Sequence, residues 1–269
     1  MELIELCRKY KISTVLKLLE NPKININETD LDGRGILYWA CVVGSVEIVK
    51  RLLQIEGINI NQSNNQGNTP LFIACSFEHI EVVKLLLESK EIDVNKSNKK
   101  NETPLFNTCH KKNVEIVKLL LQHPEIDVNQ SDHNLHSPLF IACIVNSIEI
   151  VKLLIDHPNI DINKEGDNNY TPLHISCFYN RIEIVKILLK IPNIDMNKPN
   201  HMHILPFHYV CSIDKSILVD LFLERNDIDT NKRDFNGKTP IQYAYINNSV
   251  KTIKRLSENQ YPVIRQVDN

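Results

Sequence analysis

The stretch that decides the fold is Thr69-Pro70-Leu71-Phe72-Ile73-Ala74-Cys75, which opens a unit that recurs along the chain. Thr is a residue type that caps helix N-termini. Pro suits the first helical position because its missing N–H would be unpaired there anyway. Leu71, Ala74 and Cys75 then fall on one face of a helix. The stretch therefore predicts a short amphipathic helix that begins after Thr69.

The pattern around this stretch returns with a period of 34 residues. All seven cysteines follow the period, and every gap between neighbouring cysteines is 34. One Asn and one Pro per unit keep the same spacing. The positions in register are Cys7, Cys41, Cys75, Cys109, Cys143, Cys177 and Cys211; Asn27, Asn61, Asn95, Asn129, Asn163, Asn197 and Asn231; and Pro70, Pro104, Pro138, Pro172, Pro206 and Pro240.

Each unit also predicts a second helix, such as Ile80 to about Glu88, whose apolar positions follow helical spacing. A break at Glu78 separates the two helices. An extended piece and the polar tip Asn98–Asn101 follow the second helix. The positions equivalent to Glu78 hold mostly residue types that tolerate a left-handed backbone: Gly44, Lys112, Asn146, Asn180, Asp214 and Asn248.

These units resemble ankyrin repeats over the whole chain. The residues that carry the resemblance are Thr69-Pro70-Leu71-x-x-Ala74 and the Ile-Asp-Val-Asn loop, with the His form of the motif at Thr171-Pro172-Leu173-His174. Tetratricopeptide repeats also have 34 residues, but they use nearly all of them in two long helices and carry a Trp/Gly/Tyr pattern that is absent here. The resemblance implies an all-α ankyrin-repeat solenoid of helix-turn-helix units joined by β-hairpin-like loops.

Almost eight periods fit into 269 residues, so we expect a single ankyrin-repeat domain over 1–269. Its capping units would be 1–34 at the N-terminus and 239–269, with a tail, at the C-terminus. Six complete repeats would lie between them: 35–68, 69–102, 103–136, 137–170, 171–204 and 205–238.

Composition and charge favour a folded protein with no global attraction to nucleic acid. The chain is 42% hydrophobic and 24% charged, and its formal net charge is −2. Charges interrupt every apolar stretch before it could span a bilayer, and the acidic start lacks the basic flank of a secretory signal. We therefore expect a cytoplasmic protein, with the nucleus as a second compartment, and no membrane insertion.

No residue pattern in the sequence predicts catalysis, a cofactor or a metal. Equivalent residues in stacked units lie about 8–10 Å apart, whereas a disulfide needs Cα atoms within about 7 Å. The cysteines are therefore predicted to be small buried core residues rather than disulfides or zinc ligands. The pairs His133/His136 and His201/His203 lack a third ligand, and no phosphate loop, nucleophile elbow or His-Glu-x-x-His motif is present. We expect a protein that is not an enzyme.

Three residue positions have predicted structural roles. The recurrent Asn95-type residue is expected to hold the turn that leads to the next loop. The family resemblance implies that His174 bridges neighbouring units, and the loss of the Thr at Leu205 weakens the same expectation for His208. The polar Asn107 stands where neighbouring units have Ile, and we expect it to hydrogen-bond to neighbouring backbone because unpaired burial would cost a few kcal/mol.

The resemblance implies that a protein partner binds a concave surface formed by the loop tips and the ends of the first helices. The least repetitive positions there combine aromatic anchors with a basic flank. They are Phe77, Lys99, Lys100, Lys111, Val145, Tyr170, Phe178, Tyr179 and Ile213. We expect a monomeric scaffold or adaptor for a protein of unknown identity. The alternatives are an inhibitory subunit that occludes an enzyme or transcription factor, and a secreted host-directed effector.

Overall fold

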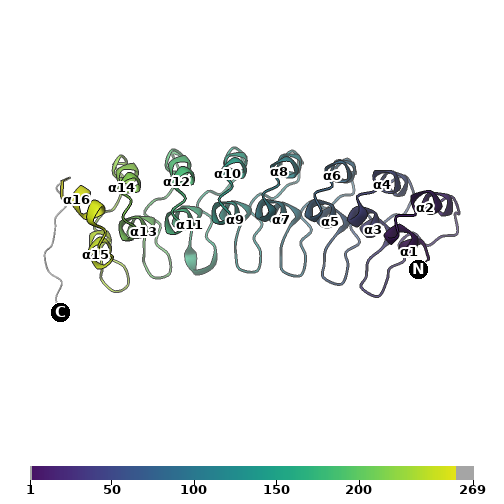
Figure 1. The fold of residues 1–269 in the computed structure, drawn as a ribbon, viewed down its shortest axis with the longest axis horizontal. Helices are drawn as coiled ribbons and strands as arrows, with labels where there is room; N and C mark the ends of the chain where they lie inside the picture. The colour runs from purple at the N-terminus through teal and green to yellow at the C-terminus, as the bar shows by residue number, and fades with distance from the viewer. Residues whose placement is uncertain (1, 259–269) are drawn as a thin grey trace. The chain divides into compact units, whose positions relative to one another are not determined.

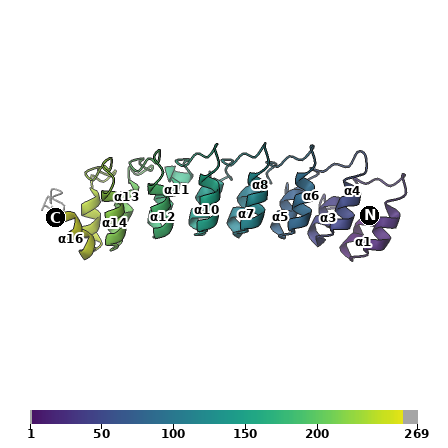
Figure 2. The same ribbon diagram turned by 90° about the horizontal axis from the view of Figure 1, so that it is seen from above.

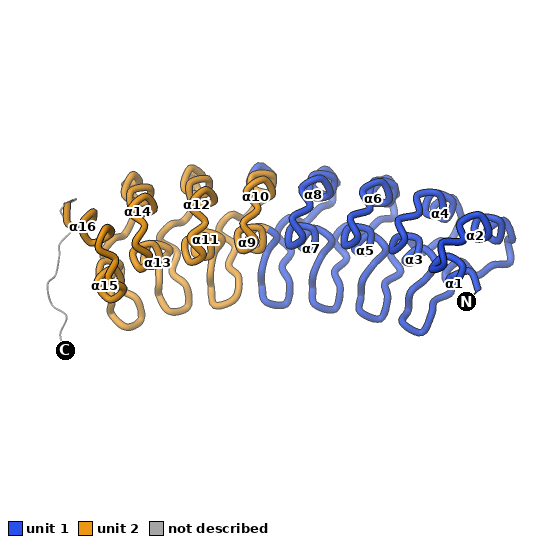
Figure 3. Tube along the Cα trace, viewed as in Figure 1, with its two compact units in different colours: residues 1–138, 156–159 blue, residues 139–155, 160–269 orange. Residues whose placement is uncertain are grey.

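The computed structural model describes residues 2–258, which form sixteen α-helices arranged as pairs. This arrangement confirms the predicted all-α repeat fold. The chain divides into two compact units (Figure 3): unit 1 comprises 1–138 and 156–159, and unit 2 comprises 139–155 and 160–269. Within the described residues, no helix is both long enough and apolar enough to span a membrane.

Unit 1 is a stack of four helix pairs, in which first helices pack on first helices and second helices on second helices (Figure 1). The pairs are α1 (Glu2–Arg8) with α2 (Ile12–Leu18), α3 (Ile36–Val43) with α4 (Val46–Leu52), α5 (Pro70–Ser76) with α6 (Ile80–Leu87), and α7 (Pro104–Lys111) with α8 (Val114–Leu121).

Unit 2 repeats this arrangement, and its helices also run side by side when seen from above (Figure 2). A single 3-10 turn, η1 (Asp167–Asn169), interrupts one loop tip. The helix pairs are α9 (Pro138–Ile144) with α10 (Ile148–Ile155), α11 (Pro172–Phe178) with α12 (Ile182–Leu189), α13 (Pro206–Ser212) with α14 (Ser216–Leu223), and α15 (Pro240–Ile246) with α16 (Val250–Glu258).

Thr side chains cap several of the first helices at the starts that the sequence predicts. The hydroxyl oxygen of Thr69 accepts a hydrogen bond from the Phe72 N–H at 3.1 Å, and Thr103 accepts one from Phe106 at 3.0 Å. In α13 the Thr is replaced by Leu205, whose side chain has no oxygen that could accept a hydrogen bond. There the ring of His208 accepts a hydrogen bond from the Leu205 N–H at 3.1 Å.

Most helix pairs turn through a residue with positive φ, as predicted. Glu78, Lys112 and the corresponding Asn residues have φ between 52° and 63°, and Gly44 has φ 68°. The expectation for Asp214 was wrong, because the preceding Ile213 is extended, with φ −105° and ψ 123°. The Asp214 carboxylate instead accepts a hydrogen bond from the Lys251 N–H, at 2.7 Å, in the first turn of α16.

The apolar faces predicted from the periodicity form the core. Leu71, Cys75, Val83 and Leu86 are completely buried in the third pair of unit 1, and equivalent residues of the other pairs are buried in the same way. Burial of such side chains stabilises a fold by about 1.5–3 kcal/mol each. No single pair can enclose this surface alone, which is why the pairs stack.

The loops are narrow turns with little strand character. One isolated bridge, between Thr29 and Gly35, is the only strand-type pairing among the described residues. Neighbouring tips within a unit are joined by backbone hydrogen bonds, such as Asn65 N–H to Asp32 O at 2.8 Å and Lys99 N–H to Gln66 O at 2.9 Å. The loop tips of a unit therefore hold one another in place.

An asparagine ladder joins consecutive loops, which extends the predicted role of these residues. The Asn95 side chain donates to the Glu125 carbonyl at 2.6 Å and accepts from the Asp127 N–H at 2.8 Å. Asn61 makes the same pair of bonds one repeat earlier, to Glu91 and Asp93. In unit 2, Asn163 and Asn197 repeat the arrangement. Each ladder Asn side chain thus supports the turn of the following repeat.

Candidate functional site

Unit 2 carries a cluster of aromatic side chains at the end of α11. Phe178 ends the helix and Tyr179 is its C-cap, so both rings leave the core where the helix stops. Phe178 is 51% exposed and Tyr179 is 44% exposed. Their ring centroids lie 5.1 Å apart in an edge-to-face arrangement. These two predicted site residues therefore form a single exposed aromatic pair.

Tyr209 of α13 completes this cluster, and the sequence analysis missed it. Its ring lies 5.4 Å from that of Phe178 and 6.0 Å from that of Tyr170. The hydroxyl groups of Tyr170 and Tyr209 are 2.6 Å apart, and the Asn200 amide donates to the Tyr209 hydroxyl at 3.3 Å. Burial, followed by the hydrogen bond with Tyr170, raises the pKa of Tyr209. Tyr209 thus brings Tyr170 and Phe178 into one surface, here named the aromatic patch (Tyr170, Phe178, Tyr179 and Tyr209).

The reason for missing Tyr209 is its position in the repeat. Ile73, Ile141 and Ile175 hold the equivalent positions, and all three are buried. A Tyr among these Ile residues was the available signal, because its hydroxyl group needs a polar partner or water when the ring packs in a core.

The other two predicted residues of unit 2, Val145 and Ile213, lie outside the aromatic patch. Both are half-buried. Ile213 lies in the extended segment that replaces the usual turn after α13.

In unit 1, the predicted residues surround the end of α5 and the tip before α7. Phe77 is 53% exposed and stacks parallel to the His79 ring at 6.2 Å. The Lys111 ammonium donates to the Ser76 carbonyl at 2.7 Å. Because Phe77 follows Ser76 in the chain, this hydrogen bond brings Lys111 close to Phe77. Lys99 and Lys100 are exposed at their tip.

Asn107 also contacts Ser76, and this corrects its predicted partner. The Asn107 amide donates to the Ser76 hydroxyl oxygen at 2.7 Å rather than to backbone. Asn107 is half-buried rather than enclosed, so a side-chain hydroxyl on the neighbouring helix is within its reach. The following Thr108 is buried and donates to the Pro104 carbonyl of its own helix.

Trp39 of α3 is a second residue that the sequence analysis did not select. The guanidinium carbons of Arg8 and Arg34 each lie 4.7 Å from the centre of its ring system. The indole N–H donates to Asp30 at 3.2 Å, and the same carboxylate oxygen accepts from Arg34. The half-buried indole is therefore held by cation–π contacts and a hydrogen bond.

The two buried histidines of unit 2 bridge repeats, as the resemblance implies. His174 Nδ1 accepts from the Thr171 N–H at 3.1 Å, so the proton is on Nε2, which donates to the Ile204 carbonyl at 3.0 Å. His208 bridges to the Lys238 carbonyl in the same way despite the loss of the Thr. Burial lowers the pKa of His174 to about 4 and also lowers that of His208. Both rings are neutral structural groups at pH 7.

The seven cysteines are completely buried core residues, as predicted. Burial raises the pKa of the Cys7, Cys75 and Cys143 thiols to about 12, which suppresses the reactive thiolate. Among residues 2–258, no three His, Cys, Asp or Glu side chains come together as a metal site would require.

We expect the native, unreduced protein to contain seven free thiols that resist alkylation until the chain unfolds. Intact-mass measurement after iodoacetamide treatment, with and without urea, would show this directly. A bound zinc ion or an intramolecular disulfide would contradict the core assignment of the cysteines.

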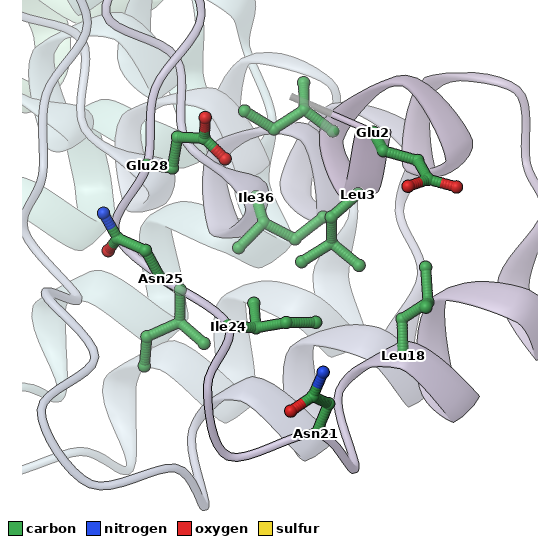
Figure 4. Close-up of a pocket in the computed structure, with 10 residues that line it drawn as sticks. Glu2, Leu3, Leu18, Asn21, Ile24, Asn25, Glu28 and Ile36 are labelled. Atoms are coloured by element: carbon green, nitrogen blue, oxygen red, sulfur yellow. The ribbon is translucent and has the colours of Figure 1, made fainter.

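A pocket of about 270 Å³ lies in the first repeat of unit 1 (Figure 4). Leu3, Leu18, Ile24 and Ile36 supply apolar walls, and carboxylate and amide groups lie at its rim. The pocket therefore exposes apolar surface where the first repeat meets the start of α3.

Comparison with known proteins identifies the repeats. A model described as ankyrin repeats (3 copies) matches residues 3–98, 90–166 and 127–200. The ankyrin repeat domain of Bcl-3, a member of the IkappaB protein family, has a similar structure: the TM-score is 0.73 at 22% identity, covering 84% of this chain and 99% of that one. The human ASB11 ankyrin repeat domain gives a TM-score of 0.66 at 25% identity, covering 85% and 99%. No curated protein sequence matches the chain.

Proposed function

Because the chain belongs to the ankyrin-repeat family, whose repeats are general protein–protein interaction modules, we propose that it is a non-enzymatic scaffold or adaptor. A protein partner binds the loop tips and the exposed ends of the first helices. The partner-binding residues are those predicted from the sequence, with Tyr209 added. The protein acts as a monomer in the cytoplasm or nucleus, without cofactor, nucleic acid or membrane insertion.

The observation that carries this proposal is the aromatic patch of unit 2. Phe178 and Tyr179 expose about half of their surfaces, although a fold without a partner gains nothing by exposing them. Tyr209 and Tyr170 hold the patch in place through their paired hydroxyl groups. Rigid, partly exposed aromatic side chains lose little entropy on binding and supply most of the energy in many interfaces.

We expect Phe178→Ala with Tyr179→Ala to weaken partner binding by about 2 kcal/mol or more, because central aromatic anchors contribute that much. The free energy of unfolding should fall by less than about 1.5 kcal/mol, since the rings are half-exposed and lose two edge-to-face contacts and the cation–π contact of Tyr179 with Arg181. Affinity capture with the full chain identifies the partner, and titration of that partner then measures the loss.

The matched control is Glu183→Ala on α12, where an exposed Glu pairs only with Lys186. This substitution should leave both binding and stability unchanged. If the aromatic variant loses several kcal/mol of stability and binds the partner normally, the rings belong to the packing between repeats. The activity of the captured partner with and without this chain separates an adaptor from an inhibitor.

A further inference from the structure

Unit 1 presents a set of basic side chains around helix α7 and two neighbouring loop tips. The basic ledge, as we name it, consists of Lys99, Lys100, His110, Lys111, Lys112 and His133. All six are exposed. The chain as a whole has a net charge of −2, so this local excess of positive charge is not a consequence of composition.

Backbone and side-chain contacts fix the members of the ledge relative to one another. The His133 N–H donates to the Lys100 carbonyl at 3.0 Å, and its ring Nε2 lies 2.7 Å from the Lys99 carbonyl. The two tips are therefore joined. Helix α7 starts directly after the Lys99–Lys100 tip, has eight residues and ends at Lys111. The helix is about 12 Å long at 1.5 Å per residue, and the Lys99–Lys100 tip precedes its start whereas Lys112 caps its end.

The charges of the ledge are not neutralised within the described residues. No ion pair there involves Lys99, Lys100, Lys111 or Lys112. In contrast, Lys198 pairs with Glu165 at 3.2 Å, and Arg34 pairs with Asp30 at 2.9 Å. The Glu102 carboxylate, next to the tip, accepts instead from the Asn98 amide at 2.8 Å. Several like charges held on a rigid repeat repel one another, and acidic groups from another molecule would relieve that repulsion.

An apolar ring borders the ledge. The Lys111 ammonium reaches the Ser76 carbonyl, and the next residue along the chain is the half-exposed Phe77. The Phe77 ring is supported on one side by His79. A ligand that follows α7 would therefore meet Phe77 and Lys111 near the end of the helix and the Lys99–Lys100 tip before its start.

We propose that the basic ledge and Phe77 bind an acidic segment of a partner protein that contains one apolar side chain. Its carboxylates pair with the ledge lysines, and its apolar residue covers the Phe77 ring. The proposal rests on the proposed function, because it assigns a partner chemistry to the predicted partner-binding residues of unit 1. A protein segment suits the surface better than nucleic acid, because the net charge of the chain is −2 and gives no global attraction for a long polyanion. The ledge also lacks the row of stacking rings that single strands require.

The test is fluorescence anisotropy of the full chain with labelled twelve-residue probes. One peptide contains Glu and Asp with a single central Leu, a second replaces this Leu with Gly, and a third replaces the acidic residues with Lys. A twelve-nucleotide oligothymidine is the fourth probe. We expect the acidic Leu peptide to bind most tightly, the Gly peptide to bind more weakly, and the Lys peptide to show no binding.

The ledge variant is Lys99→Glu with Lys100→Glu and Lys111→Glu, and it should lower affinity for the acidic Leu peptide by about tenfold or more. Binding should also weaken as salt rises. The control, Lys50→Glu with Lys90→Glu and Lys118→Glu, makes the same charge change at exposed positions of unit 1 outside the ledge. It should retain nearly all of the affinity.

Three results would overturn the proposal: an equal loss in the control, tighter binding of oligothymidine than of the acidic Leu peptide, or no binding of the acidic peptides. If the chain ignores the acidic peptides while Phe178→Ala with Tyr179→Ala still weakens partner capture, the acidic-segment proposal fails and the proposed function stands. If neither variant affects partner capture, the proposed function itself is wrong.

Discussion

Acidification from pH 7 to pH 5 is expected to destabilise unit 2 by about 2 kcal/mol through His174 alone. The ring is completely buried, and burial lowers its pKa to about 4, whereas an unfolded His titrates near 6.5. The unfolded chain therefore binds more protons between these two values. The contribution of His174 to stability is complete above about pH 6.5 and is lost as the pH falls towards 4, to a total of about 3 kcal/mol.

The geometry around His174 explains why the folded protein disfavours protonation of this ring. Nδ1 already accepts the Thr171 N–H, so a proton on Nδ1 would face another donor. Other charged groups near the ring have opposing effects on its pKa: Glu165 raises it, whereas His208 and Lys198 lower it. Burial lowers the pKa of His208 as well, so its protonation should destabilise unit 2 in the same direction.

Hydrogen exchange at pH 7 and pH 5, corrected for intrinsic rates, would check this prediction. Protection should fall over 171–258 in unit 2. The matched variant is His174→Gln with His208→Gln, because Gln242 stands at this position in the last repeat and accepts from the Thr239 N–H at 2.8 Å. This variant should lose the difference between pH 7 and pH 5. Equal protection of the native chain at both pH values would refute the assignment.

Asn95→Ala is expected to lower the free energy of unfolding by about 2 kcal/mol. The substitution removes two hydrogen bonds to the next loop, one to the Glu125 carbonyl and one from the Asp127 N–H. Each such bond contributes about 1 kcal/mol net, and water can reach the released groups because the loop is exposed. Stability in a repeat stack is close to a sum of unit and neighbour terms, so this loss falls on one junction.

Asn95→Asp keeps the shape of the side chain but removes its hydrogen-bond donor. The carboxylate keeps the acceptor for the Asp127 N–H but would face the Glu125 carbonyl without a donor, so this variant should be at least as unstable as Asn95→Ala. The control is Asn134→Ala at an exposed tip, where the amide makes only a 3.3 Å contact with Asp132. Urea unfolding followed by circular dichroism would measure all three. An Asn95→Ala variant as stable as Asn134→Ala would show that the ladder does not stabilise the stack.

The fold was predictable because its information is local and repeated. Thr69 and Pro70 define a helix start, Leu71 and Cys75 define a buried face, and the 34-residue period shows that the same unit recurs. The seven Cys positions, each 34 residues after the last, defined how the repeats align with one another. The prediction of a left-handed backbone at Asp214 was wrong because the turn depends on the extended backbone of its neighbour Ile213. No residue type in the repeat pattern specifies that conformation.

The sequence by itself determined the repeat, its two helices and the buried cysteines. Only the tertiary structure decided which side chains of neighbouring repeats meet. Tyr170 pairs with Tyr209, which is 39 residues away, and Asn95 supports Glu125, which is 30 residues away. Such contacts depend on how far one repeat is displaced from the next, and this displacement is set by the packing of the helices between them. Local sequence patterns cannot specify it, because they describe each repeat alone.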